Sequence, residues 1–271
     1  MFLTLDVGNT NIVIGAHLGP HTQSSQLTEM ILPFKTWRIS THPIGTSDEF
    51  KVKLKTLLEM EDLHWETIEA AIVSSVVPRV TGMLRGVFSK EKLRVIDYQW
   101  KFSFTSLADP PHQVGADRLV NAEAVVREFG YPAIIVDSGT ATTLCAISKK
   151  GEYLGGAIMP GIELSVESLA KRAAKLFSVE LTPPQKAIGK NTEEALKSGI
   201  ILGYASMIDG LVKRFKEEID HPSTPVIATG GVSALLKGIC TELTHYDPDL
   251  TSKGIAYLYE TNFLKKESKT S

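Results

Sequence analysis

The stretch Asp6-Val7-Gly8-Asn9-Thr10-Asn11 decides the fold of this chain, because it separates two runs of residues that favour β-strands. These runs, 2–5 and 12–15, are joined by a short segment of Gly, Asn and Asp, and this arrangement predicts a β-hairpin. Gly8 lets the backbone come close to a ligand, and successive N–H groups in a tight turn can bind an anion. An ordinary hairpin turn uses the same residue types, so this segment alone leaves both interpretations open.

The same pattern returns near the middle of the chain, as Asp137-Ser138-Gly139-Thr140-Ala141-Thr142. Asp6 then corresponds to Asp137 and Gly8 to Gly139, which is an offset of 131 in a chain of 271 residues. A duplicated domain explains this recurrence, with an Asp-x-Gly turn opening each half. The recurrence also favours a pair of phosphate-binding turns over two unrelated hairpins, because two facing acidic turns with hydroxyl groups could cradle the phosphates of a nucleotide.

Helical patterns fill the space between the β-type runs, so the fold class is α/β and each half should be a mixed sheet flanked by helices. We expect domains at 1–129 and 130–271, with the boundary near Gly130-Tyr131-Pro132, where turn residues separate a helix from a strand. Thr46-Ser47-Asp48-Glu49 has the form of a capping box and predicts a helix that runs to Leu58. Other helices are expected at 78–88, 117–129 and, after an Asn191-Thr192 cap, 193–218; strands are expected at 70–77 and 225–229.

The long helix predicted at 193–218 contains Gly199, Gly203 and Gly210. Glycine normally weakens a helix by about 1 kcal/mol relative to alanine. Small residues at this spacing also permit close packing, so the helix is a candidate for a domain or subunit interface.

The composition is that of an ordinary globular chain, with 43% hydrophobic and 22% charged residues. The 29 basic and 31 acidic side chains leave a net charge of −2, and this balance argues against a dedicated nucleic-acid binder. No apolar run approaches the roughly 18 residues of a membrane span, and Asp6 interrupts the apolar start that a signal peptide would need. Two cysteines cannot build a disulfide framework, so we expect a cytoplasmic protein without a membrane span.

Two acidic positions are candidates for chemistry. Asp6, at the end of a strand, could hold a hydrated Mg²⁺ against phosphate oxygens. Asp117 could accept a proton from a substrate hydroxyl, and Arg118 could pair with a substrate carboxylate. A surface ion pair between Asp117 and Arg118 is the alternative. The segment Gly155–Gly161 is either a turn that ends a strand or a place where the backbone approaches a ligand.

Other nucleotide and metal motifs fail. Gly189-Lys190-Asn191-Thr192 resembles the end of a Walker motif, but it lacks the earlier glycine and has Asn where Ser or Thr must reach Mg²⁺. No G-x-G-x-x-G follows a strand, and the histidines lack the spacing of a zinc site. A dinucleotide-binding fold is therefore not expected.

With these segments the chain resembles the type III pantothenate kinases, which belong to the superfamily of acetate and sugar kinases, heat-shock chaperones and actin. The resemblance covers nearly the whole chain. The Asp-x-Gly turns are common to the superfamily, whereas Gly115-Ala116-Asp117-Arg118 and Gly189-Lys190-Asn191-Thr192 are specific to this family. The remaining marks are Val76-Val77-Pro78, Gly155-Gly156, Pro160-Gly161 and Thr229-Gly230-Gly231.

The resemblance implies two ribonuclease-H-like domains, as in the actin-like ATPases, with ATP bound between them. It implies ATP-dependent phosphorylation of the 4′-hydroxyl of pantothenate, the first step of coenzyme A synthesis. It further implies Mg²⁺, a monovalent cation that is K⁺ or NH₄⁺, and a homodimer. Nucleic acid and membrane are not expected as partners.

The resemblance also assigns roles to individual residues. Asp117 would be the general base and Asp137 would bind the monovalent cation. The residues implied for ATP are Asp6, Val7, Gly8, Asn9, Thr10, Asn11, Ile12, Val13 and Thr140. Those implied for pantothenate are Gly115, Ala116, Asp117, Arg118 and Thr192.

One position departs from the family pattern. The family usually has a tyrosine seven residues before the glycine of Gly-Ala-Asp-Arg, and this chain has Ala108 there, with Tyr98 ten residues earlier. The change supports a second hypothesis, a superfamily kinase for another small hydroxy acid. The resemblance leaves a third hypothesis, a non-catalytic accessory factor for transcription, because some members of the family have been described in that role.

Overall fold

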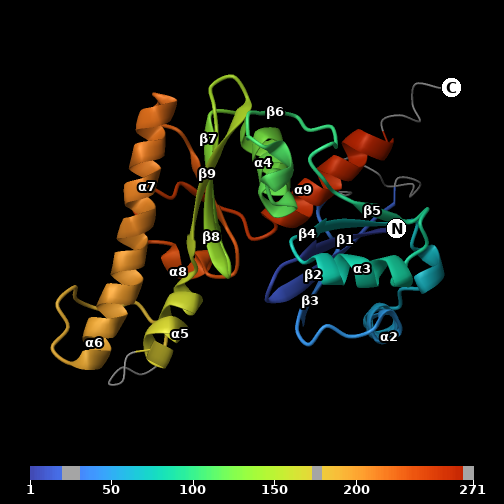
Figure 1. Ribbon diagram of the computed structural model, residues 1–271, viewed down its shortest axis with the longest axis horizontal. Coiled ribbons are helices and arrows are strands. Elements are labelled where there is room, and N and C mark those ends of the chain that lie inside the picture. Colours follow the sequence, from blue (N-terminus) through green and yellow to red (C-terminus); the bar gives the residue numbers. More distant parts are fainter. Residues whose placement is uncertain (20–30, 173–178, 265–271) are drawn as a thin grey trace. The chain divides into compact units, whose positions relative to one another are not determined.

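The computed structural model describes residues 1–19, 31–172 and 179–264, which form two compact units (Figure 1). Unit 1 comprises the described residues of Met1–Ser103, Asp109–Arg127 and Asp249–Ser271. Unit 2 comprises those of Phe104–Ala108 and Glu128–Pro248. The units therefore do not follow each other along the chain, because the C-terminal segment returns to unit 1. The division at 129 and 130 remains a prediction about the duplicated halves.

Unit 1 is built on a five-stranded mixed sheet with the order β3-β2-β1-β4-β5. The hairpin of β1 and β2 is antiparallel, β3 pairs antiparallel with β2, and the other two pairings are parallel. The strands are β1 (Phe2–Val7), β2 (Asn11–His17), β3 (Lys35–Ser40), β4 (Ala70–Ser75) and β5 (Leu93–Val95).

Unit 2 repeats this plan in a six-stranded sheet with the order β11-β10-β7-β8-β9-β6. Five of its strands have the same order and the same strand directions as the sheet of unit 1, and β6 is an addition at the edge. The strands are β6 (Thr105–Ser106), β7 (Ala133–Ser138), β8 (Ala141–Ile147), β9 (Glu152–Pro160), β10 (Val226–Thr229) and β11 (His245–Tyr246). The predicted duplication of a mixed sheet is confirmed.

Helices cover both faces of the sheet in unit 1. Leu3, Leu5 and Val7 pack with apolar residues of α2 (Ser47–Glu59) and α3 (Pro78–Val87). On the other face, Phe2 and Ile72 pack with α4 (Ala116–Phe129) and α9 (Leu250–Tyr259). This division follows from the alternation of side chains along a strand. Short helical segments complete the unit: η1 (Trp65–Thr67), η2 (Pro111–Gln113) and η4 (Glu260–Leu264).

In unit 2, one face of the sheet is covered by a long helical run, drawn in orange beside β7–β9 in Figure 1. The run consists of α6 (Thr192–Lys197), the π-helix η3 (Ser198–Leu202) and α7 (Gly203–Ile219). Its residues Ile201, Ile208 and Val212 are buried among those of β7 and β8. The same core includes residues of α5 (Ile162–Arg172) and α8 (Ser233–Leu236).

The predicted helix starts are confirmed in detail. Thr46 accepts from the N–H of Glu49, and the Glu49 carboxylate accepts from the N–H of Thr46, as a capping box requires. Asn191 caps α6 by accepting from the N–H of Glu194 at 2.9 Å. The helix predicted at 78–88 begins at Pro78 as expected.

The expectation about apolar runs needs a correction. Among the described residues, the run Thr192–Ile219 is long and apolar enough, by length and composition alone, to cross a membrane. Helices in the core of proteins outside membranes pass the same test, and this one contributes Ile201, Ile208 and Val212 to the core of unit 2.

Candidate active site

The first Asp-x-Gly turn is a tight β-hairpin in unit 1. Asp6 pairs with Val13 across the two strands, and the N–H of Gly8 donates to the carbonyl of Asn11 at 3.0 Å. Asn9 and Thr10 are exposed at the tip, and the Asp6 carboxylate is half-buried. The tip thus combines short polar side chains with exposed backbone, as phosphate binding in a turn requires.

Thr41, which directly follows β3, holds this turn from the side. Its hydroxyl donates to the carbonyl of Gly8 at 2.7 Å, and its N–H donates to the carbonyl of Thr10 at 2.9 Å. Thr41 is buried. The sequence does not predict this role, because its only signal is a threonine after a short β-type run, and nothing in the pattern indicates partners 31 and 33 residues earlier.

The second turn, in unit 2, is one residue shorter. Asp137 pairs with Thr143, and the N–H of Gly139 donates to the carbonyl of Ala141 at 3.2 Å. Thr140 is exposed at the tip, and Asp137 is half-buried. The two turns therefore present an acid at the same position of equivalent hairpins.

Two glycines allow other segments to reach this second turn. A Cβ on Gly161 would overlap the carbonyl oxygens of Gly139 and Thr140, and the Gly161 N–H donates to the Thr140 carbonyl at 3.0 Å. Gly230, with φ of +90°, lies so close that its Cβ would be 2.6 Å from Oδ1 of Asp137. Gly161 and Gly230 therefore lie close to the backbone and to the Asp137 carboxylate of the turn itself. A role of Gly155–Gly161 toward a ligand stays a prediction.

The Gly115–Arg118 segment forms the start of α4 in unit 1. The carbonyl of Gly115 accepts from the N–H of Arg118 at 3.1 Å. Oδ1 of Asp117 accepts from the same N–H at 2.8 Å, so the carboxylate is held against the first turn of the helix. A Cβ on Gly115 would overlap Oδ1 of Asp117, which means that only glycine leaves room for the carboxylate in this position.

Burial raises the pKa of Asp117 above its ordinary value. The hydrogen bond from the Arg118 N–H and the charge of the Arg118 guanidinium lower it, but the loss of hydration is the larger effect. A carboxylate with a raised pKa is a stronger base, and this property distinguishes Asp117 from an aspartate in an ordinary surface ion pair.

Val76 connects this helix start with the first hairpin. Its N–H donates to the carbonyl of Val7 at 3.1 Å, and its Cγ1 lies 3.5 Å from the position of a Cβ on Gly115. The ends of β1 and β4 and the start of α4 therefore meet, and Asp6 and Asp117 lie at the same end of the unit 1 sheet.

The Gly189–Thr192 segment lies in unit 2, at the start of α6. A Cβ on Gly189 would overlap the backbone of Glu194 and Ala195, and the Lys190 N–H donates to the Glu194 carboxylate at 2.7 Å. Thr192 is exposed on the first turn. The segment is thus a rigid helix start that presents a hydroxyl to its surroundings.

The predicted site residues are divided between the units. Unit 1 contains the residues of 6–13 and 115–118, and unit 2 contains Asp137, Thr140 and Thr192. Ala108 is half-buried after β6 in unit 2. Tyr98 belongs to unit 1, where its ring meets that of His112 edge-on at 6.3 Å, just ahead of Gly115.

No cluster of three His, Cys, Asp or Glu side chains that could hold a metal occurs in the described part of the chain. Mg²⁺ usually binds through one or two carboxylates together with phosphate oxygens and water. Asp6 and Asp137 are oxygen donors at strand ends and fit this kind of site. The Gly230 backbone beside Asp137 adds a close-packed wall to the second position.

Comparison with known sequences agrees with these features. Residues 2–214 match the family described as type III pantothenate kinase. A type III pantothenate kinase from Rubrobacter xylanophilus is 42% identical over 271 residues, which cover 97% of this chain and 98% of the relative.

Similar folds occur among solved structures of low sequence identity. A Baf-family protein from Campylobacter jejuni, described as a transcriptional activator, is 19% identical, with 96% of this chain and 98% of that chain covered and a TM-score of 0.62. The activator of 2-hydroxyisocaproyl-CoA dehydratase from Clostridium difficile, solved with bound ADPNP, is 18% identical, with 100% and 97% covered and a TM-score of 0.56. At these identities the likeness shows the fold alone, which agrees with the duplicated fold that the family resemblance implies.

Proposed function

Because the chain belongs to the type III pantothenate kinase family, we propose that it transfers the γ-phosphoryl group of ATP to the 4′-hydroxyl of pantothenate, the first step of coenzyme A synthesis. The observation that carries this proposal is the carboxylate of Asp117, held at the start of α4 with a raised pKa. Phosphoryl transfer to an alcohol needs such a base next to the attacking oxygen.

In the proposed reaction, Asp117 accepts the hydroxyl proton of pantothenate. Oδ1 is engaged by the Arg118 N–H, so Oδ2 is the oxygen that remains for the proton. The hydroxyl oxygen forms a bond to the γ-phosphorus while the bond from that phosphorus to the β,γ-bridging oxygen breaks, and ADP leaves with the bond electrons. The products are 4′-phosphopantothenate, ADP and the proton on Asp117.

Arg118, Gly115 and Ala116 are proposed to position pantothenate. The guanidinium of Arg118 can pair with the substrate carboxylate in a two-pronged geometry. Gly115 has a different task, because its missing side chain leaves room for the Asp117 carboxylate. Thr192 is proposed as a further hydroxyl contact to pantothenate, supported by its exposure on the first turn of α6.

The phosphates of ATP are proposed to bind at the two hairpin turns, through residues 6–13 and Thr140. The Thr41 hydrogen bonds support the first turn by holding Gly8 and Thr10 in place before a ligand arrives. Asp6 would hold a hydrated Mg²⁺ ion, which would neutralise phosphate charge. Asp137 is proposed to hold the monovalent cation, K⁺ or NH₄⁺, against the backbone around Gly230.

We propose that the protein works as a homodimer in the cytoplasm, without nucleic-acid or membrane partners. Gly199, Gly203 and Gly210 are exposed, and within the described residues nothing lies within 4 Å of a Cβ on any of them. The close packing predicted for these glycines therefore has no partner in the described part of the same chain. Exposed apolar side chains of unit 2 support a partner surface: Leu154, Ile158, Leu164, Leu169, Ile188 and Met207.

A coupled assay of ADP release tests the proposal. We expect pantothenate-dependent turnover with ATP and Mg²⁺ that needs K⁺ and falls when Na⁺ replaces it. Asp137→Ala should lose most of the K⁺ response, whereas Asp109→Ala, an exposed aspartate outside both turns, should keep it. ATP binding without pantothenate turnover would favour another hydroxy acid as substrate, and a screen of such acids would then follow.

A further inference from the structure

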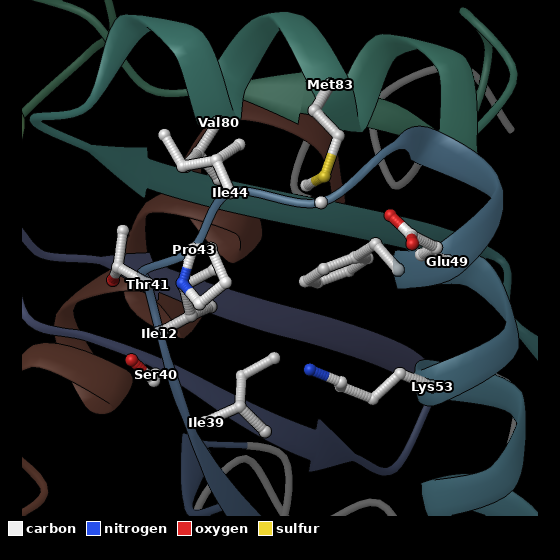
Figure 2. Close-up of a pocket in the computed structure, with 12 residues that line it drawn as sticks. Ile12, Ile39, Ser40, Thr41, Pro43, Ile44, Glu49, Lys53, Val80 and Met83 are labelled. Atoms are coloured by element: carbon white, nitrogen blue, oxygen red, sulfur yellow. The ribbon is translucent and has the colours of Figure 1, made fainter.

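A cavity of about 280 Å³ opens in unit 1, and its lining includes Ile12 of the first hairpin and Thr41, which holds the turn of that hairpin (Figure 2). It lies between the end of β3, the loop that follows β3, and the helices α2 and α3. Seven apolar residues line it: Ile12, Ile39, Pro43, Ile44, Phe50, Val80 and Met83. In Figure 2 the side chain of Met83 points into the cavity from α3.

The cavity lies on the face of the sheet opposite to Asp6. Ile12 pairs with Val7, and both belong to the core beneath α2 and α3. Asp6 precedes Val7 in the same strand, so its side chain points to the other face. The cavity therefore lies on the opposite face of the sheet from the Asp6 carboxylate, although it shares Ile12 and Thr41 with the first turn.

Most polar groups around the cavity already have partners. The hydroxyl of Ser40 donates to the carbonyl of His42 at 2.6 Å, and that of Thr41 donates to Gly8. The Glu49 carboxylate accepts from the N–H and the hydroxyl of Thr46. These groups are thus engaged within the loop and the capping box.

Lys53 is different, because no hydrogen bond or ion pair joins its ammonium group to the described residues, although its positive charge interacts with the Glu49 carboxylate one helical turn earlier. Figure 2 shows its Nζ extending over the cavity beside Ile39. The neighbouring lysines of α2, Lys51 and Lys55, instead lie over the ring of Trp65, at 5.4 and 5.8 Å from its centroid. Lys53 is therefore the cation that α2 presents to this cavity.

We propose that this cavity binds a small aliphatic monocarboxylate, with its chain among the isoleucines and its carboxylate at Lys53. Apolar walls favour an aliphatic chain, and a single cation at the mouth favours one negative charge at the end of that chain. A volume of about 280 Å³ has room for a small ligand. An aliphatic amine is the competing class, because Glu49 also borders the cavity.

Calorimetric titration of the nucleotide-free full chain with hexanoate tests this site, and it does not depend on kinase activity. We expect saturable binding with a dissociation constant on the order of 1 mM. Lys53→Gln should weaken hexanoate binding by up to about fivefold, because an exposed charge pair contributes up to about 1 kcal/mol. Lys51→Gln removes the same charge from the same helix outside the cavity and should bind hexanoate as the wild type does.

One uncharged probe and one positively charged probe test the class of ligand. Hexan-1-ol should bind the wild type and Lys53→Gln equally, and hexylammonium should bind more weakly than hexanoate. Met83→Trp fills the cavity and should abolish hexanoate binding. If the larger side chain prevents folding, Lys53→Gln still tests the proposal, because Lys53 is exposed and its replacement should leave the fold intact. Absence of saturable hexanoate binding, equal binding by Lys53→Gln, or preference for hexylammonium would each overturn the proposal.

Discussion

Asp117 experiences two opposing influences on its proton affinity. Loss of hydration disfavours its negative charge, whereas the Arg118 N–H and guanidinium favour it. The raised pKa shows that desolvation is the larger of the two. A desolvated carboxylate lowers the free energy of unfolding when it is charged, and the raised pKa that results from desolvation makes it a better base.

Replacement of Asp117 by Asn should therefore separate chemistry from binding. The amide oxygen can still accept from the Arg118 N–H, but it cannot take the hydroxyl proton. We expect kcat to fall by about 10²- to 10⁴-fold, with ATP affinity nearly unchanged. Steady-state kinetics and nucleotide titration measure the two effects, and Asp109→Asn serves as the control. Full turnover by Asp117→Asn would remove Asp117 from the role of base.

The same substitution predicts a pH-dependent change in stability. The pKa of Asp117 is raised in the folded state, so proton binding by Asp117 stabilises the fold. This contribution to the free energy of unfolding is complete below the unfolded-state pKa of about 4 and is lost as the pH rises through the folded-state pKa. Asn carries no charge to desolvate. Asp117→Asn should therefore melt above the wild type at about pH 8, by about 2–4 °C per kcal/mol relieved, and this advantage should vanish near pH 4. Calorimetric scans over this range check it, and a lower melting temperature at pH 8 would contradict it.

At the scale of elements, the first phosphate turn depends on a residue outside its own hairpin. Thr41, which follows β3, donates hydrogen bonds to Gly8 and Thr10 in the turn between β1 and β2. The turn is therefore held by both of its own strands and by the segment after β3. Since a preformed turn loses less entropy when a ligand binds, this contact should contribute to nucleotide affinity.

Thr41→Val keeps the side-chain shape and removes only the hydroxyl. The carbonyl of Gly8 then loses a hydrogen bond of 2.7 Å, and we expect the KM for ATP to rise about fivefold, which corresponds to roughly 1 kcal/mol. The KM for pantothenate should change less. Thr56→Val is a matched control, because Thr56 donates to the Val52 carbonyl within α2, away from the turn. An unchanged KM for ATP would show that the turn holds its shape without Thr41.

The sequence predicts local features of this fold well and distant contacts poorly. The Asp-x-Gly turns, the capping box at Thr46 and the cap at Asn191 all depend on neighbours within a few residues, and each is present. The contacts of Thr41 with Gly8 and of Gly230 with Asp137 join residues far apart in the chain. The spacing of residues along the sequence does not predict such pairs, because the residues come together only when the sheet forms.

At the scale of the molecule, the return of α9 to unit 1 has the same explanation. Ile255 and Leu258 are apolar at helical spacing, which predicts a buried helix but not the sheet that buries it. Their partners, Phe2 and Ile72, lie more than 180 positions earlier in the chain. A boundary inferred from a duplication therefore differs from a unit defined by contacts.

The exposed glycines of the long helix give the prediction for the assembly. Gly203→Arg places a charge on the proposed partner surface, and within the described residues nothing lies within 4 Å of the added Cβ. Arginine is also a better helix former than glycine, by up to about 1 kcal/mol, so the monomer fold should persist. Gly82→Arg on α3 is the matched control, since Gly82 is likewise exposed with nothing within 4 Å. Light scattering should give twice 29.6 kDa for the wild type and the control, and a monomer for Gly203→Arg. A dimeric Gly203→Arg would mean that the subunits meet elsewhere.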